Sequence, residues 1–280
     1  MALRAYWKGH IRLSLVSFKV RLFAAVTASE KLSLHQYDKE TGGRIRYQKV
    51  DQSGEEVPAE DIVKGYEYEK GSYVPIEDED LEELRLESKH TIDLVQFTDV
   101  DKIDPIYFER SYYVAPEGEI AQEAFLTVRE ALKSSGKAAI GQVILNKKER
   151  IVCLRPCCNG LIMDTLRYAY EVREAQQYFD DIPKKADINK EQLQLATQLI
   201  DQKTQDFDPQ TFKDRYQEGL LEIIEAKMKG KKIHAAAPEK TEENVVDIVS
   251  ALKESLAQSE KKKKTTKKTT KKKTAGKKAG

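Results

Sequence analysis

The sequence is poor in several features that mark particular classes of protein. Its 280 residues include three cysteines and four scattered histidines. Cys153, Cys157 and Cys158 have no fourth ligand nearby, so we expect free thiols on strands, not a zinc site or disulfides. There is no run of eighteen apolar residues, and the N-terminus lacks the apolar stretch of a signal peptide. We therefore expect a cytoplasmic protein without a membrane span or a bound metal.

The motifs of common enzyme classes are also missing. No G-x-G-x-x-G follows a predicted strand, and neither H-E-x-x-H nor G-x-S-x-G occurs. Gly136–Gly141 has P-loop spacing, but Gln142 and Val143 stand where lysine and serine or threonine would hold phosphate and magnesium. The carboxylates of Glu77–Glu83 could form a nuclease metal site, but they fit the solvated first turn of a helix better. We expect no catalytic residues and no cofactor.

Acidic residues are missing from the end of the chain. The last twenty residues hold eleven lysines and no acid, whereas residues 1–260 carry a formal net charge of −10. A lysine run among threonine, alanine and glycine cannot bury a core, which predicts a disordered polycation. It suits a polyanion such as nucleic acid or an anionic membrane, although an inert solubility tail is the plain alternative. Its candidate DNA-binding residues are Lys261, Lys262, Lys263, Lys264, Lys267, Lys268, Lys271, Lys272 and Lys273.

The first 29 residues are basic and also lack acids. Apolar residues occupy odd positions from Trp7 to Leu15 and even positions from Phe18 to Leu22. This alternation predicts two strands with a bulge or break near Val16–Ser17. The opposite faces carry cations, including Arg12, Lys19 and Arg21, which could contact phosphates or simply face solvent.

Short strands dominate the prediction for residues 1–170, around one amphipathic helix at Ile120–Ser135 that ends at Gly136. Such a series of antiparallel strands predicts a barrel or a sandwich. The further strands are expected at residues 44–47 before a turn at Asp51–Gly54, in a hairpin of Val63–Tyr68 and Tyr73–Ile76, at Thr91–Phe97 and Tyr107–Val114, and in a meander of Ala138–Leu145, Arg150–Leu154 and Leu161–Tyr168.

Helices are predicted after Pro183. One covers Ile188–Thr204, and a second runs from Pro209 through Met228, with Asp208 as its N-cap. A linker at residues 231–240 leads to a short amphipathic helix. The apolar stripe of that helix could fold back onto the body or dock into a partner's groove. Its candidate partner-binding residues are Val245, Val249, Leu252 and Leu256.

Several collinear motifs together resemble bacterial Ku, the DNA-end-binding family of non-homologous end joining. The resemblance covers roughly residues 1–230 and is more specific than any single short pattern. Its motifs are Tyr6–Val16, Leu34–Gln36, Gly43–Tyr47, Asp61–Tyr68, Ile103–Phe108, Tyr112–Tyr113 and Leu166–Tyr168.

The resemblance implies a mainly β fold with helices: a Ku-type β-barrel core with inserted helices, a C-terminal helical arm and a disordered basic tail. The expected divisions are 1–182 for the barrel with a DNA-encircling segment, 183–230 for a dimerising arm, 231–258 for a ligase-docking region and 259–280 for the tail. It further implies a ring-shaped homodimer that threads double-stranded DNA ends, recruits the ATP-dependent DNA ligase D and performs no chemistry itself.

A ring that accepts any broken end must bind the phosphate backbone and ignore base identity. We expect such a protein at the bacterial nucleoid. The other hypotheses are an architectural DNA-binding protein driven by its tail, a metal-dependent nuclease, and a membrane-surface protein anchored through Val245–Leu256. Chosen by charge and placement, the candidate channel residues are Lys8, Arg12, Lys19, Arg21, Arg44, Arg46 and Lys64.

Overall fold

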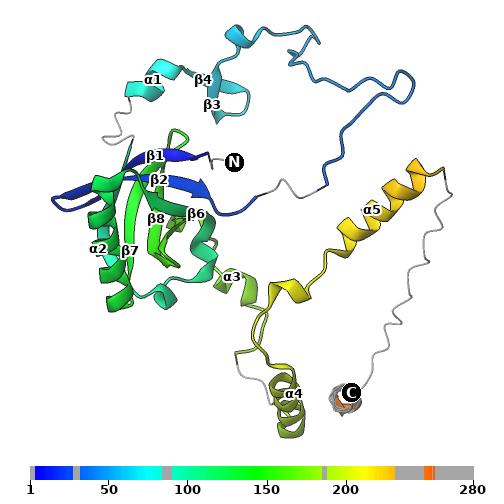
Figure 1. The fold of residues 1–280 in the computed structure, drawn as a ribbon. Coiled ribbons are helices and arrows are strands. Elements are labelled where there is room, and N and C mark those ends of the chain that lie inside the picture. The colour runs from blue at the N-terminus through cyan, green and yellow to red at the C-terminus, as the bar shows by residue number, and fades with distance from the viewer. Residues whose placement is uncertain are drawn as a thin grey trace, which may run out of the picture. The chain divides into compact units, whose positions relative to one another are not determined.

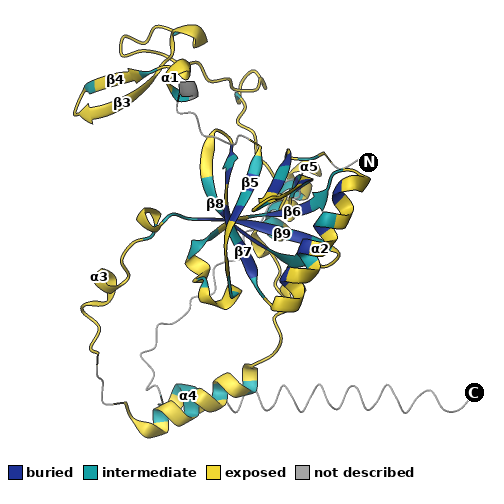
Figure 2. Ribbon diagram, turned by 90° about the vertical axis from the view of Figure 1, so that its left-hand side faces the viewer, coloured by how far each residue is buried: buried dark blue, intermediate teal, exposed yellow. Residues whose placement is uncertain are grey.

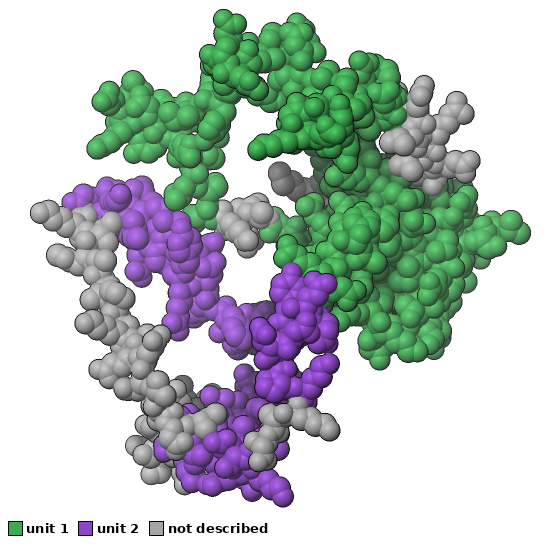
Figure 3. Space-filling view, turned by 180° about the vertical axis from the view of Figure 1, so that it is seen from behind, with its two compact units in different colours: residues 1–174 green, residues 175–280 purple. Residues whose placement is uncertain are grey.

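The computed structural model describes residues 4–27, 32–83, 90–184, 188–230, 249–253 and 255. The chain divides into two compact units, residues 1–174 and 175–280 (Figure 3). The division falls between Glu174 and Ala175. The functional divisions at 182, 230 and 258 stay predictions.

Seven strands of the first unit close into a barrel in the order β1-β2-β6-β9-β8-β7-β5 (Figure 1). Neighbouring strands are antiparallel except β1 and β5, whose parallel pairing closes the barrel. A barrel, and not a sandwich, is therefore the fold. Its strands are β1 (Trp7–Leu13), β2 (Val16–Ala24), β5 (Thr91–Thr98), β6 (Phe108–Pro116), β7 (Ala138–Leu145), β8 (Lys148–Cys157) and β9 (Gly160–Leu166).

The apolar residues of the first two strands switch from odd to even positions at a hairpin turn. Leu13 pairs with Val16, which leaves a two-residue loop of Ser14 and Leu15. Ser14 has φ 54°, the positive angle that tight hairpins need. Leu15 continues the odd-numbered apolar series in sequence, yet it lies 99% exposed at the tip. The break was correctly expected but falls two residues earlier.

One apolar core fills the barrel and continues onto helix α2 (Glu119–Ser135). Phe18 and Phe125 meet edge to face, with ring centroids 6.3 Å apart. The helix ends as predicted, because Gly136 adopts the left-handed conformation and its N–H binds the last carbonyls. Figure 2 shows this burial gathered in the barrel strands and in the inner side of α2.

Residues between β2 and β5 form a separate excursion. It contains the predicted hairpin, β3 (Lys64–Glu69) with β4 (Ser72–Ile76), and helix α1 (Asp78–Glu83). The turn at Asp51 is also present, since Gly54 N–H donates to Asp51 O at 3.2 Å. The strand expected at residues 44–47 was wrong. Only a single bridge, Tyr37 to Arg44, forms there, because alternation cannot make a strand without a neighbouring strand to pair with.

The described residues of the second unit lie largely in helices, and none of them is buried. Helix α3 (Gln176–Phe179) is one turn, and α4 (Lys190–Lys203) is capped by Asn189, whose side chain accepts from two backbone N–H groups. Neither α4 nor α5 (Arg215–Met228) contains a buried residue. Residues 249–253 and 255 are helical.

The long helix predicted from Pro209 to Met228 was wrong in its first turns. Asp208 does cap a turn, but this is the 3-10 turn Pro209–Thr211, after which Phe212 is extended. A second aspartate, Asp214, then accepts from Gln217 N–H and starts α5. Aspartate binds nearby backbone N–H groups outside helices, so the second aspartate favours a new start over continuation.

Candidate nucleic-acid interface

The outward face of the β1–β2 hairpin gathers four of the predicted channel cations. The register places Lys8 opposite Arg21 and Arg12 opposite Ser17, with Lys19 between them opposite His10. Their neighbours along the strands point into the core, because successive side chains in a strand alternate between faces. Two strands thus present one continuous basic face.

Two carboxylates from neighbouring elements lie on this face. Lys8 Nζ is 2.6 Å from Glu117 Oε1, and Arg12 binds both oxygens of Asp93 at 2.9 and 2.7 Å. The hydrogen bond from Lys8 holds the pKa of Glu117 below its usual range, and Arg12 does the same for Asp93. These pairs are solvent-exposed and therefore weak, so a phosphate can compete for the cations.

Arg21 is held by packing more than by polar contacts. Its guanidinium carbon lies 5.6 Å from the centre of the Phe23 ring, and Nη2 donates to Pro116 O at 3.5 Å. Its Nε is buried without a hydrogen-bond partner among the described residues. An oriented guanidinium loses less side-chain freedom when it binds an anion.

The other three predicted channel residues belong to the excursion. Arg44 Nη2 is 3.3 Å from His35 Nδ1, and Arg46 is exposed. Lys64 binds Asp78 Oδ1 at 2.8 Å, which lowers the pKa of Asp78. Across the described ranges, no hydrogen bond or ion pair joins these three to the basic face of β1–β2. Their place in one channel stays a prediction.

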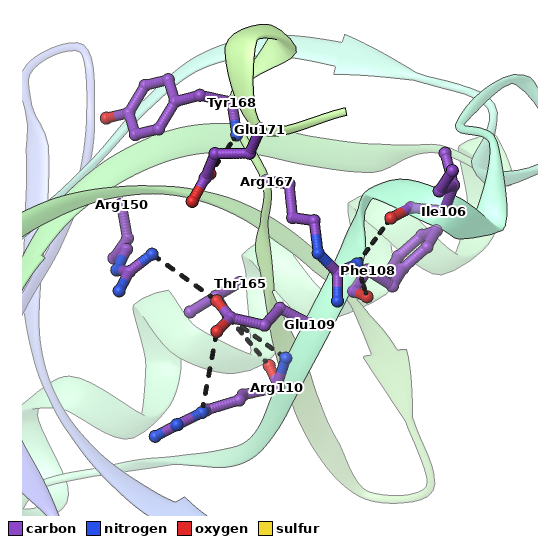
Figure 4. Close-up of polar contacts among 9 residues, drawn as sticks. All are labelled: Ile106, Phe108, Glu109, Arg110, Arg150, Thr165, Arg167, Tyr168 and Glu171. Atoms are coloured by element: carbon purple, nitrogen blue, oxygen red, sulfur yellow. Dashed lines mark hydrogen bonds and ion pairs between the residues drawn. The ribbon is translucent and has the colours of Figure 1, made fainter. Parts of the chain in front are cut away.

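A second basic cluster lies at one end of the barrel and was missed in the sequence (Figure 4). Glu109 Oε2 is 3.6 Å from Arg150 Nη1, and its Oε1 is 3.9 Å from Arg110 Nε. Thr165 Oγ1 donates to Glu109 at 3.4 Å. Nearby, Arg167 donates to the carbonyls of Ile106 and Phe108 at 2.5 and 2.7 Å, so it ties the start of β6 to the end of β9.

The comparison with protein families decides what this barrel is. The family described as the Ku70/Ku80 β-barrel domain matches residues 12–195. The chain belongs to the Ku family. Its relatives named non-homologous end joining protein Ku include those of Acidobacterium capsulatum, 43% identical over 91% of this chain and 85% of the relative, and of Bacillus subtilis, 38% identical over 91% and 82%. The Bradyrhizobium relative of the same name is 39% identical over 93% and 89%.

This Ku-family membership confirms the resemblance read from the collinear motifs. It accounts for the barrel but assigns no contacts to individual residues. Of the candidate partner-binding residues, Val249 and Leu252 are helical and half-buried, whereas Val245 and Leu256 lie outside the described residues. The nine tail lysines from Lys261 to Lys273 also lie outside them.

The described part of this Ku-family chain shows three features relevant to metal ions, membranes and the P-loop spacing. It contains no group of three or more side chains able to hold a metal ion. None of its helices is long and apolar enough to cross a membrane. The P-loop spacing of Gly136–Gly141 joins a helix end to strand β7, where a Cβ on Gly141 would lie 2.2 Å from Asp93 O.

The missed cluster follows from the parity of β8, which the sequence alone does not settle. Val152 and Leu154 face the barrel core, so Lys148 and Arg150, at the same parity of β8, also face inward. Cations at inward positions of a barrel strand are unusual. This parity could be read only once the core-facing residues of β8 were known.

Proposed function

We propose that this chain binds double-stranded DNA ends without regard to sequence, as a ring-shaped homodimer, and brings an ATP-dependent DNA ligase to the break during non-homologous end joining. The observation that carries the proposal is the basic face of β1–β2 on a Ku-family barrel. Four cations there face two carboxylates, and all four cations lie on strands. Cations on rigid strands suit phosphate contacts, which position a duplex without reading its sequence.

Dimerisation is supported by the helices of the second unit. Helices α4 and α5 bury no residue within the chain, yet large apolar side chains lie on them. Apolar helix faces without a covering partner mark sites of protein association. A second copy of the chain would cover them in a homodimer. The exposed residues are Leu193, Ile200, Tyr216, Leu221, Ile223 and Met228.

The decisive experiment for end binding is a competition between a linear duplex and the same DNA as a closed circle. It uses the full-length protein at about 0.15 M salt, where screening is physiological. Because a closed ring loads only where a duplex stops, the linear form should compete far better. Equal competition would favour the alternative, an architectural DNA-binding protein driven by its polycationic tail, and would remove end binding from the proposal.

Ligase recruitment is assigned to the region after residue 230. Leu252→Asp together with Leu256→Asp should weaken stimulation of ligase D and spare DNA binding, because charge disrupts an apolar docking stripe. Ser250→Asp, at an exposed helical position, adds a charge outside that stripe and is the control. Ligation assays with purified ligase D measure the effect. Unchanged stimulation in the leucine variant would leave that helix without a docking role. Such a complex would act at the bacterial nucleoid.

A further inference from the structure

The two ends of the barrel differ in chemistry. At one end, α2 lies beside Leu13 and Val16 and adds its apolar stripe to the core. The opposite end has a polar hollow of about 240 Å³, which we call the barrel mouth. It is lined by Tyr6, Glu109, Arg110, Tyr112, Leu145, Asn146, Lys148, Arg150 and Thr165. Mouths of β-barrels are frequent ligand sites.

Three cations and one carboxylate line the barrel mouth. Glu109 is the carboxylate, and it is shared between Arg110 and Arg150 at 3.9 and 3.6 Å. Charge-assisted hydrogen bonds are usually about 2.7–2.9 Å long, so Glu109 leaves guanidinium donors available to another acceptor. Lys148 forms no ion pair among the described residues. The mouth therefore holds an excess of positive charge.

Neutral donors complete the barrel mouth. Asn146 Nδ2 donates to Tyr6 Oη at 2.7 Å, and the Tyr6 and Tyr112 rings lie 5.1 Å apart. Burial, and then the neighbouring Tyr6, raise the pKa of Tyr112, so its hydroxyl stays protonated at neutral pH. Guanidinium, ammonium and hydroxyl groups converging on one hollow are the donor set that binds a tetrahedral oxyanion.

We propose that the barrel mouth binds a phosphate group of a DNA strand, with Arg110, Lys148 and Arg150 as its ligands. This assignment rests on the DNA binding proposed above. The hollow holds several times the roughly 30 Å³ share of one water molecule, so a phosphate fits. The excursion leaves the barrel beside the mouth, where Ala25 N–H donates to Ser111 O at 3.1 Å.

The first test uses inorganic phosphate alone. Replacing chloride by phosphate at constant ionic strength should raise the Tm of the full-length protein, since a ligand of the folded state stabilises it. Compared with the wild type, the rise should be smaller in the variant Arg110→Gln/Lys148→Gln, which keeps only the general effect of phosphate on folded proteins. It should be larger in Glu109→Gln, which removes the competing carboxylate. Arg110 and Lys148 are exposed, so the double variant should fold. Lys133→Gln removes an exposed cation on α2 and should keep the rise.

The second test separates two sources of the phosphate. Duplexes with 5′-phosphate and with 5′-hydroxyl ends are bound to the wild type and to the double variant over a series of salt concentrations. The slope of log K against log salt should fall by about 0.9 for each phosphate that the double variant no longer neutralises. If the wild type prefers the 5′-phosphate duplex several-fold and the double variant does not, the mouth binds the phosphate at a strand end. If the wild type shows no preference, the mouth binds a phosphate of the DNA backbone.

Two results would overturn the proposal. One is a rise in Tm that is the same in the double variant as in the wild type. The other is a double variant whose binding to both duplexes has the wild-type slope of log K against log salt. This result would show that the mouth does not bind DNA, even if it binds free phosphate. The same variants are also tested by competition between linear and circular DNA. This separates a failure of the phosphate site from a failure of the proposed end binding. A retained linear preference leaves the proposed function standing and removes only the phosphate site.

Discussion

At the scale of single residues, close packing makes some positions intolerant of any added atom, whereas substitutions at the surface cost less. Gly141 illustrates the first case, because β5 approaches its backbone so closely that a Cβ would lie 2.2 Å from Asp93 O. Arg12 illustrates the second, since its bidentate contact with Asp93 lies at the barrel surface. The two positions should respond very differently to substitution.

Gly141→Ala should destabilise the barrel by about 1–3 kcal/mol or more, the cost of overpacking against a backbone that cannot move aside. Gly219→Ala is the control, because nothing lies within 4 Å of its Cβ and it sits inside α5. An alanine there should leave the unfolding midpoint of the barrel unchanged, because α5 lies outside the barrel unit. Urea unfolding followed through Trp7, the single tryptophan, reports on the barrel. Equal midpoints for Gly141→Ala and wild type would contradict the close approach.

Arg12→Gln should raise the pKa of Asp93 toward its ordinary value, because the hydrogen bond from Arg12 is the main cause of its depression. A depressed carboxyl pKa contributes stability above the unfolded value of about 4, and this contribution is lost as pH falls through the folded pKa. The variant should therefore be less stable at neutral pH, by up to about 1 kcal/mol. In acid the difference should vanish. An NMR titration of Asp93 and unfolding at several pH values measure both effects; an unmoved pKa would refute the pairing.

At the scale of elements, the register of β1 and β2 turns scattered basic residues into one face. Lys19 and Arg21 alternate with Val20 and Leu22, which lie in the core. Their charge can therefore be removed without opening the core, although Arg21→Gln also loses the contact with the Phe23 ring at the surface. This makes the basic face testable as a unit.

Lys19→Gln and Arg21→Gln should each weaken binding to a linear duplex and lower the slope of log K against log salt by about 0.9 if each cation neutralises one phosphate. Lys133→Gln, on α2, should leave the slope near its wild-type value. Fluorescence anisotropy over a range of salt concentrations gives these slopes. Slopes that are unchanged in the β2 variants would exclude this face from DNA contact.

Elements could be predicted where the signal was local and repeated. Strands β1 and β2 were expected from their alternating apolar residues, and α2 from its apolar stripe and its stop at Gly136. The strand at residues 44–47 and the continuous helix from Pro209 were wrong, since the first lacks a pairing partner and the second contains a competing cap at Asp214. Both errors arise where a neighbour in space or in sequence overrides the local pattern.

At the scale of the whole molecule, charge is unevenly distributed along the chain. Residues 261–280 hold eleven lysines, whereas the remainder carries a formal net charge of −10. Such a tail raises the local concentration of DNA near any binding site on the barrel. Affinity and end preference should therefore depend on different parts of the protein.

Deletion of residues 261–280 should lower affinity for DNA and flatten its salt dependence, because fewer counterions are released on binding. Preference for linear over circular DNA should survive, since topology and not charge produces it. Gel-shift competition at several salt concentrations tests both statements on one pair of proteins. If end preference disappeared with the tail, the threading account of the barrel would be wrong.

The sequence by itself determined the charge division, the barrel strands, helix α2 and the Ku resemblance, because these depend on patterns between near neighbours in the chain. Only the tertiary structure decided that Arg110, Lys148 and Arg150 share one hollow with Glu109. They come from β6 and β8, and because both strands pair with β9, their ends lie close together. A barrel mouth has no sequence signature of its own, because it is made by the return of distant strands to the same end of the core.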